Sequence, residues 1–415
     1  MYRKEFLLHQ HTPMIHFQAK TEGATLRGSD LKPRLDKFII RKLLKSDSKT
    51  AEERLTKLKA SEYQHWLYQG NGAQHPSLDY TVKIFSLENS DDKEINITNR
   101  DKMIPYFGNR AFLAIEKDLV CLEIQSRNKG LFEFILDNTY EFFFWNNFGT
   151  RNTKGFGSYF PVDQPKNFDL IRPKYWFDIE TNNTKRLFEI ISKFYSTLRS
   201  GINVNGFYFK SLLWKYLRDN DHQWDKRSIK EKFLARAIED ETTDHEDEIN
   251  GDFDDFPLTY ESREDKKDLK LWRDVLGLST DQSWYYYKAT VKKEHVYSTK
   301  ETKIDRFPSP LFFKPLRLSA KTYRVYFDVP LHIKEAFMAP LNYSNAESEI
   351  LGEKFKIKFN NAQPLELAYP NSFDFDDFFK SAFATNLESY VQNRGNQRDF
   401  KELKKIYSTL KTQVQ

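Results

Sequence analysis

The stretch FGTRNTKGFGSYF, residues 148–160, decides how we interpret this chain. It follows a strongly apolar segment and sets glycines around two basic residues, Arg151 and Lys154. Glycine tolerates positive φ and has no side chain in the way of an approaching group, so successive backbone amides in such a loop can meet phosphate oxygens. We therefore predict a phosphate-binding loop whose cradle is Gly155-Phe156-Gly157. The alternative that these residues leave open is a structural turn that closes a domain edge.

Two aromatic residues of the same stretch, Phe156 and Tyr159, have two candidate uses: they stack on bases, or they pack beneath the loop. Other glycine-rich sites do not fit the pattern. The interval from Gly149 to Gly155 is too long for a P-loop, and no Lys-Ser or Lys-Thr pair follows it. The loop also leads toward a strand, whereas a dinucleotide fingerprint opens a helix.

Upstream of the loop, the sequence predicts a first strand at residues 11–18 and then a helix that begins at Ser29 or Asp30. The apolar residues of this helix recur at helical spacing, and Pro33 falls in the first turn, where its missing N–H costs little. The opposite face is basic, and it is either a solvated face or a stripe that faces phosphates. The basic residues on this face are Lys32, Arg34, Lys37, Arg41, Lys42 and Lys45.

The segments around the loop predict an α+β architecture. Residues 78–87 alternate as a strand, 111–115 and 119–125 have the pattern of a hairpin, and 131–148 is apolar on nearly all sides, as in a buried helix. The resulting order is strand, helix, strands, helix, loop and strand. This order suits a ferredoxin-like sheet with helices on one face.

The second half of the chain repeats the mixture of helices and strands. We predict helices at residues 184–199, 208–217, 226–238, 265–276, 373–391 and 400–410, and strands at 284–297, 311–318, 322–329 and 354–359. The length suggests about two domains. We place a first domain at 1–180, which contains the glycine-rich loop, and a second at 181–415, with a helical insertion at about 184–278.

Charge and cysteine content narrow the class of protein. Lys and Arg total 65 against 60 Asp and Glu, for a net charge of +5. Residues 239–255 contain ten carboxylates and no Lys or Arg, so the remainder is more basic than the net charge suggests. A nucleic-acid partner would need that positive charge gathered on one face. That acidic run, with His245 inside it, lacks the ligand spacing of a calcium loop and is typical of a solvated segment. Cys121 is the only cysteine, which excludes an internal disulfide and a cysteine-based zinc site.

We expect the protein to be soluble and cytoplasmic. Its first residues, MYRKEFLLHQHTP, lack the apolar region of a signal peptide. No apolar run approaches the roughly 20 residues that span a membrane. A single cysteine also fits a reducing compartment. We expect no membrane partner, no metal and no cofactor.

The glycine-rich loop resembles the signature of RAMP proteins, the ferredoxin-like RNA binders of CRISPR systems. Their pattern is glycine–hydrophobic–glycine, a basic stretch, and glycine–hydrophobic–glycine again. The second half stands in this chain as Gly155-Phe156-Gly157. The first half is reduced to Phe148-Gly149, with Thr150 where many members carry another glycine.

Two further segments are similar to the large, two-RAMP head subunit of type III-B (Cmr) CRISPR complexes. Thr12-Pro13-Met14-Ile15, followed by residues 23–35, is similar to the opening of that subunit, with Pro33 in place of a glycine. Residues 306–311 (RFPSPL) are similar to its "R.ASPL" stretch. The three similar segments occur in the same order and are spread over most of the chain.

This resemblance implies two ferredoxin-like RAMP domains and a noncatalytic RNA-binding subunit in antiviral defence. The implied partners are guide CRISPR RNA, near its 3′ part, target RNA and other Cmr subunits. Binding would rest on phosphate contacts and stacking, largely independent of base sequence. The implied RNA-binding residues are Arg27, Lys32, Arg34, Lys37, Arg41, Arg151, Lys154, Gly155, Phe156, Gly157, Tyr159, Arg306 and, by position only, Lys314.

Two alternatives remain from the sequence. His9, His11 and His16 cluster near the predicted first strand, and related RAMP nucleases use a histidine to cleave RNA without a metal. A histidine can act as general base on a 2′-hydroxyl, so a metal-independent RAMP endoribonuclease that processes guide RNA is the enzyme alternative. The other alternative is a scaffold that contacts only proteins, with its aromatic residues in cores and interfaces.

Overall fold

The computed structural model describes residues 1–15, 26–44, 51–68, 77–86, 93–97, 112–116, 119–163, 165, 167–204, 207–225, 229, 269–278, 281–284, 289–296, 307–338, 350–359, 363–387 and 398–415. The chain forms two compact units. The larger unit consists of Met1–Tyr195, Pro310–Ala346 and Phe379–Gln415, and the smaller unit consists of Ser196–Ser309 and Glu347–Phe378. The two units therefore alternate along the chain, and the boundary after residue 180 stays a prediction.

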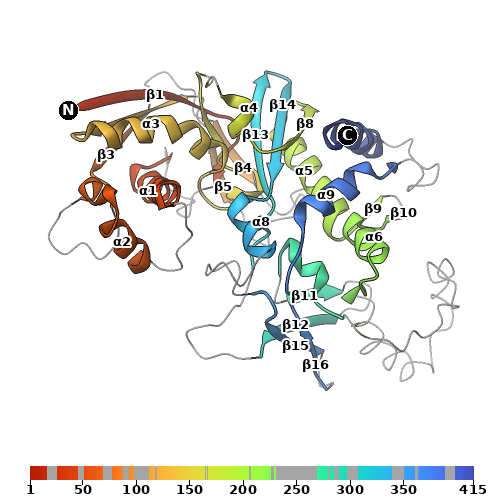
Figure 1. Cartoon of the computed structure of the whole chain (residues 1–415). Helices are drawn as coiled ribbons and strands as arrows, with labels where there is room; N and C mark the ends of the chain where they lie inside the picture. The colour runs from red at the N-terminus through yellow and green to blue at the C-terminus, as the bar shows by residue number, and fades with distance from the viewer. Residues whose placement is uncertain are drawn as a thin grey trace, which may run out of the picture. The chain divides into compact units, whose positions relative to one another are not determined.

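The larger unit contains a four-stranded antiparallel sheet with the order β3-β6-β1-β7 (Figure 1). Helix α1 (Gly28–Leu44) follows β1 in the chain, and helix α3 (Lys129–Phe144) connects β6 to β7. The chain order is thus strand, helix, two strands, helix and strand, with β1 and β6 at the centre of the sheet. The strands are β1 (Tyr2–Gln10), β3 (Tyr80–Ser86), β6 (Leu119–Ser126) and β7 (Tyr159–Pro161).

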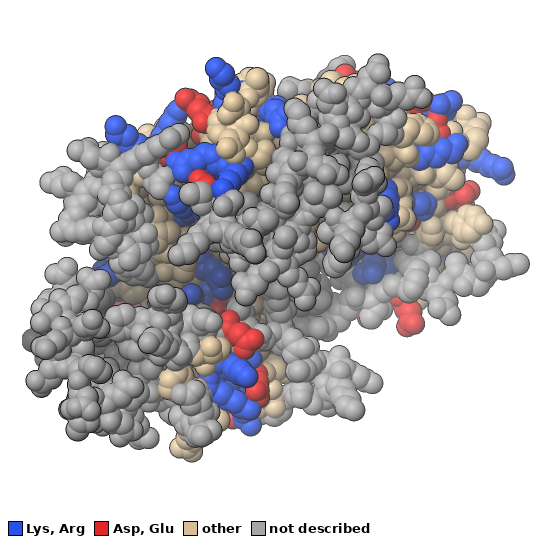
Figure 2. All heavy atoms as spheres, turned by 180° about the vertical axis from the view of Figure 1, so that it is seen from behind, with Lys and Arg blue, Asp and Glu red and all other residues tan. Residues whose placement is uncertain are grey.

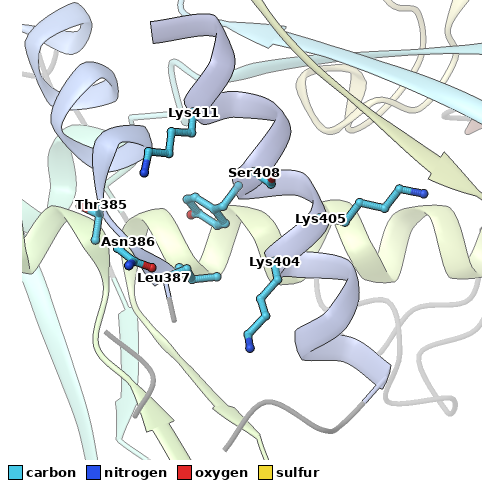
Figure 3. A pocket seen from close by; sticks show the side chains of 8 residues that line it. Thr385, Asn386, Leu387, Lys404, Lys405, Ser408 and Lys411 are labelled. Carbon is cyan, nitrogen blue, oxygen red and sulfur yellow. The ribbon is translucent and has the colours of Figure 1, made fainter. Parts of the chain in front are cut away.

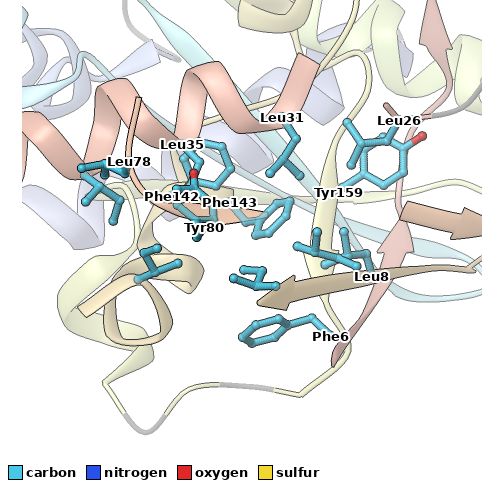
Figure 4. Close-up of a cluster of buried hydrophobic side chains, with 14 of the residues drawn as sticks. Phe6, Leu8, Leu26, Leu31, Leu35, Leu78, Tyr80, Phe142, Phe143 and Tyr159 are labelled. Carbon is cyan, nitrogen blue, oxygen red and sulfur yellow. The ribbon is translucent and has the colours of Figure 1, made fainter. Parts of the chain in front are cut away.

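The core of this part lies between one face of the sheet and the two helices (Figure 4). Phe6 and Leu8 alternate along β1 toward the helices. In α1, Leu31 and Leu35 lie one turn apart and are almost completely buried, so the helix turns one apolar stripe toward the sheet. Each such side chain contributes roughly 1.5–3 kcal/mol on burial. Phe142 of α3 completes the cluster.

A second antiparallel sheet of the larger unit has the order β13-β14-β8. Its strands are β8 (Tyr175–Glu180), β13 (Phe312–Ser319) and β14 (Thr322–Asp328). Aromatic rings join it to helices α5 (Thr184–Arg199), α9 (Phe375–Ala384) and α11 (Arg398–Val414). The ring of Phe177 lies 4.9 Å from that of Phe194, and the ring of Tyr175 lies 5.0 Å from that of Phe383.

The larger unit also contains a small sheet with the order β2-β5-β4 and several short helices. These elements are β2 (Met14–Ile15), β4 (Lys93–Ile97), β5 (Phe112–Glu116), α2 (Ala51–Lys59), η1 (Glu62–Trp66), η2 (Asn152–Lys154), α4 (Phe168–Ile171) and α8 (Leu331–Met338).

The smaller unit contains a four-stranded antiparallel sheet, β11-β12-β15-β16, and a two-stranded one, β10-β9. Its core includes an ion pair between Lys293 and Asp274, whose side chains have no exposed surface. The elements are β9 (Ile202–Val204), β10 (Phe207–Phe209), α6 (Leu212–Asp219), η3 (Trp272–Leu276), β11 (Asp281–Trp284), β12 (Ala289–His295), β15 (Lys354–Phe359) and β16 (Leu365–Ala368).

The α+β class is confirmed, and several predicted elements are wrong in position or pairing. The first strand is β1, at Tyr2–Gln10, and within the described part of the predicted strand 11–18 a strand forms at Met14–Ile15. The predicted hairpin does not form, because β5 pairs with β2 and β4 while β6 pairs with β1 and β3. The predicted helix 226–238 lies almost wholly outside the described residues, as does the acidic run. Among the described helices, none is both long and apolar enough to cross a membrane.

Candidate nucleic-acid interface

The glycine-rich loop connects α3 to β7, and its three glycines take the left-handed backbone conformation that the sequence predicted. Their φ angles are +79° at Gly149, +95° at Gly155 and +65° at Gly157. A Cβ at Gly157 would lie 2.0 Å from the carbonyl oxygen of Phe148. Glycine is therefore required here by both φ and the close approach of backbone.

Arg151 holds the same left-handed conformation, with φ 58° and ψ 30°, although it has a side chain. Thr150, where the RAMP pattern has glycine, is not among the described residues with positive φ, so threonine causes no backbone strain there. Its N–H donates to the carbonyl of Ile15 over 2.8 Å. The strain of this loop is thus carried by Arg151, and such strain is concentrated at functional positions in proteins.

In the predicted phosphate cradle, the N–H groups of Gly155 and Gly157 donate to carbonyls of the same chain. The N–H of Gly157 donates to the carbonyl of Pro13 over 2.8 Å, and the N–H of Gly155 donates to that of Asn152 over 3.1 Å. The loop is folded back on the segment between β1 and β2, so these donors are already used. The glycine backbone supports the loop and does not present its amides to phosphate.

Buried hydroxyl groups hold the loop in place from two directions. Thr12 Oγ1 donates to the carbonyl of Gly155 over 2.6 Å and accepts from the N–H of Ser158 over 3.0 Å. Ser158 Oγ donates to the carbonyl of Pro315 in β13 over 2.7 Å. All of these groups are buried, where a hydrogen bond to a polar partner is required. Sequence reasoning gave neither hydroxyl this role, because their partners Gly155 and Pro315 are more than a hundred residues away in the chain.

Lys314 of β13, which the sequence predicted by position to contact RNA, is completely buried. Its ammonium donates to the carbonyl of Tyr159 over 2.8 Å, to Asn147 Oδ1 over 3.1 Å and to the carbonyl of Asn146 over 3.2 Å. Burial lowers the pKa of Lys314 well below its ordinary value, because desolvation disfavours the charged form. The side chain joins the second sheet to both ends of the loop region.

The aromatic residues of the loop pack beneath it and have no surface on which a base could stack. Phe156 is fully buried, with its ring parallel to that of Phe188 at 3.7 Å between centroids. Tyr159 is fully buried as well, and its ring meets Phe148 at 6.0 Å. Of the two uses left open by the sequence, packing is the one realised.

The two basic residues of the loop differ in environment. The ammonium of Lys154 is buried and lies 3.6 Å from the centroid of the Tyr195 ring, a cation–π contact within the protein. Arg151 is half-buried and keeps part of its surface exposed. Of these two residues, Arg151 is therefore the one with surface that an RNA phosphate can reach.

The basic residues of α1 also differ in whether their side chains make contacts inside the protein or keep exposed surface. Lys32 donates to Asp36 Oδ2 over 2.8 Å and lies over the Tyr80 ring, so it stabilises the helix–sheet packing. Arg34 donates to the carbonyl of Asn147 over 2.8 Å, and burial lowers its pKa. This bond fixes α1 to the beginning of the loop.

Three further predicted RNA-binding residues near or on α1 keep exposed surface. Lys37 is exposed, and Arg27 and Arg41 are half-buried. Arg41 Nη1 lies 3.3 Å from Nδ1 of His332 in α8. Lys and Arg side chains are interleaved with Asp and Glu on the face of the molecule in Figure 2. Arg306 lies outside the described residues.

The predicted histidine cluster is partly formed. The rings of His9 and His11 lie 4.4 Å apart, and His16 lies outside the described residues. His11 is buried, and its Nδ1 accepts a hydrogen bond from the N–H of Arg317 over 2.8 Å. Burial, followed by the charges of His9, Lys314 and Arg317, lowers the pKa of His11 well below its ordinary value. Among the described residues there is no cluster of side chains suited to a metal ion.

Two family models match this chain, and both describe Cmr1. Residues 1–202 match the family model of the Cmr1 N-terminal domain, and residues 208–405 match that of the Cmr1 C-terminal domain. Among solved structures, the crystal structure of Cmr1 from Pyrococcus furiosus (apo form) is similar, at 12% identity and a TM-score of 0.35, covering 80% of this chain and 89% of that one. No curated protein matches this chain.

Proposed function

Because this chain belongs to the Cmr1 family, and is thereby a subunit of a type III-B CRISPR (Cmr) complex, we propose that it binds RNA there without cutting it. The RNA is the 3′ part of the guide, the target RNA, or both, in a cytoplasmic complex that acts in antiviral defence. Other Cmr subunits are its protein partners.

The order of elements supports two ferredoxin-like domains. In the first, β1, α1, β3, β6, α3 and β7 follow in the chain and the sheet has the order β3-β6-β1-β7, which is a split βαβ arrangement. In the second, β8, α5, β13 and β14 follow in the chain and the sheet has the order β13-β14-β8. In their sheet, β8, β13 and β14 occupy the positions that β1, β3 and β6, respectively, occupy in the first sheet. On this proposal, the two segments of the smaller unit, Ser196–Ser309 and Glu347–Phe378, are insertions into the second domain, whereas the sequence predicted one insertion at about 184–278.

The observation that carries the RNA-binding proposal is the conformation of Arg151. Its left-handed backbone costs about 1–2 kcal/mol relative to an ordinary conformation, although glycine would take the same φ without that cost. Arg151 therefore places a basic side chain at a position where glycine would avoid this cost. Half-buried Arg27, Arg41 and exposed Lys37 supply further positive charge with accessible surface.

The test compares RNA binding by the wild-type protein and the variant Arg151→Gly. A labelled guide RNA is titrated at several salt concentrations, and we expect a roughly fivefold weaker affinity near 0.1 M salt, because removal of one phosphate contact changes the salt slope by about 0.7. Thermal stability should stay within about 1 kcal/mol of the wild type, since relief of strain offsets the greater entropy of glycine when unfolded.

The matched control is Lys321→Gln, which removes one positive charge, as Arg151→Gly does. Lys321 is exposed in the turn between β13 and β14. This variant should bind RNA as the wild type does. If Arg151→Gly and the wild type bound RNA with equal affinity at every salt concentration, the loop would not be part of the RNA interface.

The enzyme alternative has one observation in its favour, the close approach of the His9 and His11 rings. We propose that the protein is not a nuclease, because His11 is buried and its Nδ1 already accepts a backbone hydrogen bond. Incubation of purified protein with repeat RNA in EDTA should give no cleavage product. Product formed by wild type and abolished in His11→Asn would show that this proposal is wrong.

A further inference from the structure

The first sheet carries a row of apolar side chains on the face opposite α1 and α3. Leu7 of β1 stands directly opposite Cys121 of β6, and Cys121 stands opposite Phe85 of β3. The N–H of Val162, just after β7, donates to the carbonyl of Leu7 over 2.8 Å and continues the pairing of β7 with β1. Because residues directly opposite each other lie on the same face and within contact distance, the row crosses the whole sheet.

The side chains of this row are exposed within the chain. Leu7 and Phe85 each keep 40% of their surface exposed and Val162 keeps 50%, while Cys121 is half-buried. Single exposed apolar residues are normal on a protein surface, whereas a contiguous apolar patch marks an interaction site. The row continues over four adjacent chain segments, so it belongs to the second kind.

The sequence of the two central strands points to the same conclusion. An antiparallel strand with one solvated face alternates apolar and polar residues, whereas a strand buried on both faces is apolar without interruption. Where the row crosses them, β1 reads FLL at residues 6–8 and β6 reads VCL at residues 120–122. At this level of the sheet, both strands therefore have the composition of strands that are covered on both sides.

The second sheet of the larger unit provides a contrast, because helix α11 of this chain covers the edge of its strand β8. Gln413 of α11 accepts from the N–H of Trp176 over 3.0 Å and donates to the carbonyl of the same residue over 2.8 Å. Lys405 Nζ of α11, labelled in Figure 3, pairs with Glu180 Oε1 at the end of β8 over 2.6 Å. The exposed fractions show that the apolar row of the first sheet has no comparable cover from the described part of the chain.

The charged residues beside the row compensate one another. Arg3 forms ion pairs with Glu5 and Glu123, and Lys83 Nζ lies 3.4 Å from Glu123 Oε1. These residues carry two positive and two negative charges on the same face as the row. An RNA-binding surface needs a net positive charge, whereas an interface between proteins has an apolar centre and a polar rim. The face therefore suits a protein better than RNA.

We propose that this face of the first sheet is the docking surface for another protein subunit of the Cmr complex, whose contacting side chains are apolar and uncharged. The proposal rests on the part of the proposed function that gives this chain other Cmr subunits as partners. Leu7 and Phe85 form the centre of the docking surface, and Arg3, Glu5 and Lys83 form the rim on one side.

The first test measures the affinity of the full-length chain for a Cmr complex that is purified from the remaining subunits without it. The double variant Leu7→Thr/Phe85→Thr keeps residues that are favourable in strands and should bind at least about tenfold more weakly, as truncation at the centre of a protein interface does. The control Leu318→Thr/Leu331→Thr removes exposed apolar surface outside the row and should bind as the wild type does. Melting temperatures of both variants should match the wild type.

The second test needs no substitution, because Cys121 lies within the row and is the only cysteine of the chain. A maleimide should modify Cys121 in the free protein, and this modification should be lost in the assembled complex, where the partner covers the row. Mass spectrometry of the peptide that contains Cys121 measures the modified fraction in both states.

Both expected results together support the inference, and any other combination overturns it. If the wild type does not join the complex, the proposed function loses its protein partners. If the wild type joins, the double variant joins equally well and Cys121 stays reactive, the docking surface alone is wrong.

Two other occupants of this face would also overturn the inference. Weaker binding of a fluorescein-labelled oligouridylate by Leu7→Thr/Phe85→Thr, with unchanged assembly, would assign the face to RNA. A free wild-type protein that sediments as a dimer and becomes monomeric in this variant, with unchanged assembly, would assign the face to a second copy of the chain.

Discussion

At the scale of single residues, polar side chains of types that are usually exposed are buried inside the protein. Lys314 and His11 are both buried beside the glycine-rich loop, and the pKa of each is lowered mainly by desolvation. Each is held by hydrogen bonds to its neighbours, His11 through the N–H of Arg317. These residues position the loop from inside the protein.

The buried His11 predicts a pH dependence of stability. Its pKa is lower in the folded than in the unfolded protein, so the unfolded state binds more protons below the ordinary value of 6.5. The free energy of unfolding should therefore fall as the pH drops from about 6.5 through the lowered pKa of the folded state. In His11→Asn, where Oδ1 takes over the acceptor role of Nδ1, this part of the pH dependence should disappear.

Denaturant melts of wild type and His11→Asn between pH 7.5 and 4.5 measure this effect. His65, which is exposed on η1, provides the control variant His65→Asn, and the pH dependence of this variant should follow the wild type. Parallel pH profiles for all three proteins would contradict the assignment of His11.

At the scale of elements, Asn147 links three parts of the larger unit. Its Nδ2 donates to the carbonyl of Asn152 in the loop over 2.7 Å and to that of Phe313 in β13 over 2.8 Å. Its Oδ1 accepts from Lys314, and its carbonyl accepts from Arg34 of α1. One side chain with its peptide unit thus holds α1, the loop and β13 together.

Replacement of Asn147 by leucine should destabilise the protein by about 3–9 kcal/mol. The change leaves two carbonyls and the Lys314 ammonium with fewer partners, at about 1–3 kcal/mol for each buried group. The matched control is Asn146→Leu, because Asn146 is half-buried and its side chain makes one hydrogen bond, to the carbonyl of Phe142 over 2.9 Å. Urea unfolding measures both variants, and similar losses in the two would contradict the role of Asn147.

Local pattern was sufficient to predict the elements whose sequence signal is strong. Helix α5, strand β15 and the positive φ of Gly155 and Gly157 follow from periodicity and from glycine itself. The partners of the loop amides could not be predicted, because Pro13 is more than a hundred residues away from Gly157 in the sequence. Strand β1 was missed because only its second half alternates clearly between buried and exposed residues.

At the scale of the whole molecule, the two compact units have separate cores. The smaller unit contains the buried pair Lys293–Asp274, and Tyr369 donates from its hydroxyl to the carbonyl of Asp274 over 3.0 Å. Burial and the neighbouring Asp274 raise the pKa of Asp225 in the same core. Charged groups at this depth require their partners, so this core is sensitive to the loss of one of them.

Lys293→Met should destabilise the smaller unit by about 3–5 kcal/mol, because it leaves Asp274 as a buried charge without its ammonium partner. Hydrogen exchange followed by mass spectrometry should show faster exchange in β12 and β15, with unchanged exchange in β6 and α3 of the larger unit. Lys292→Met, an exposed neighbour in β12, is the control. Faster exchange in both units to the same extent would show that they unfold together.

The division of the larger unit into three chain segments affects how the protein folds while the ribosome synthesises it. Strand β8 ends at Glu180, and its pairing partner β14 ends at Asp328, after nearly 150 further residues that include the first segment of the smaller unit. At roughly 5–20 residues per second, synthesis of that interval takes about 7–30 s. During this time the nascent chain carries the aromatic strand β8 without its neighbour. The period in which a chaperone would be most useful to this protein therefore lies in the middle of its translation.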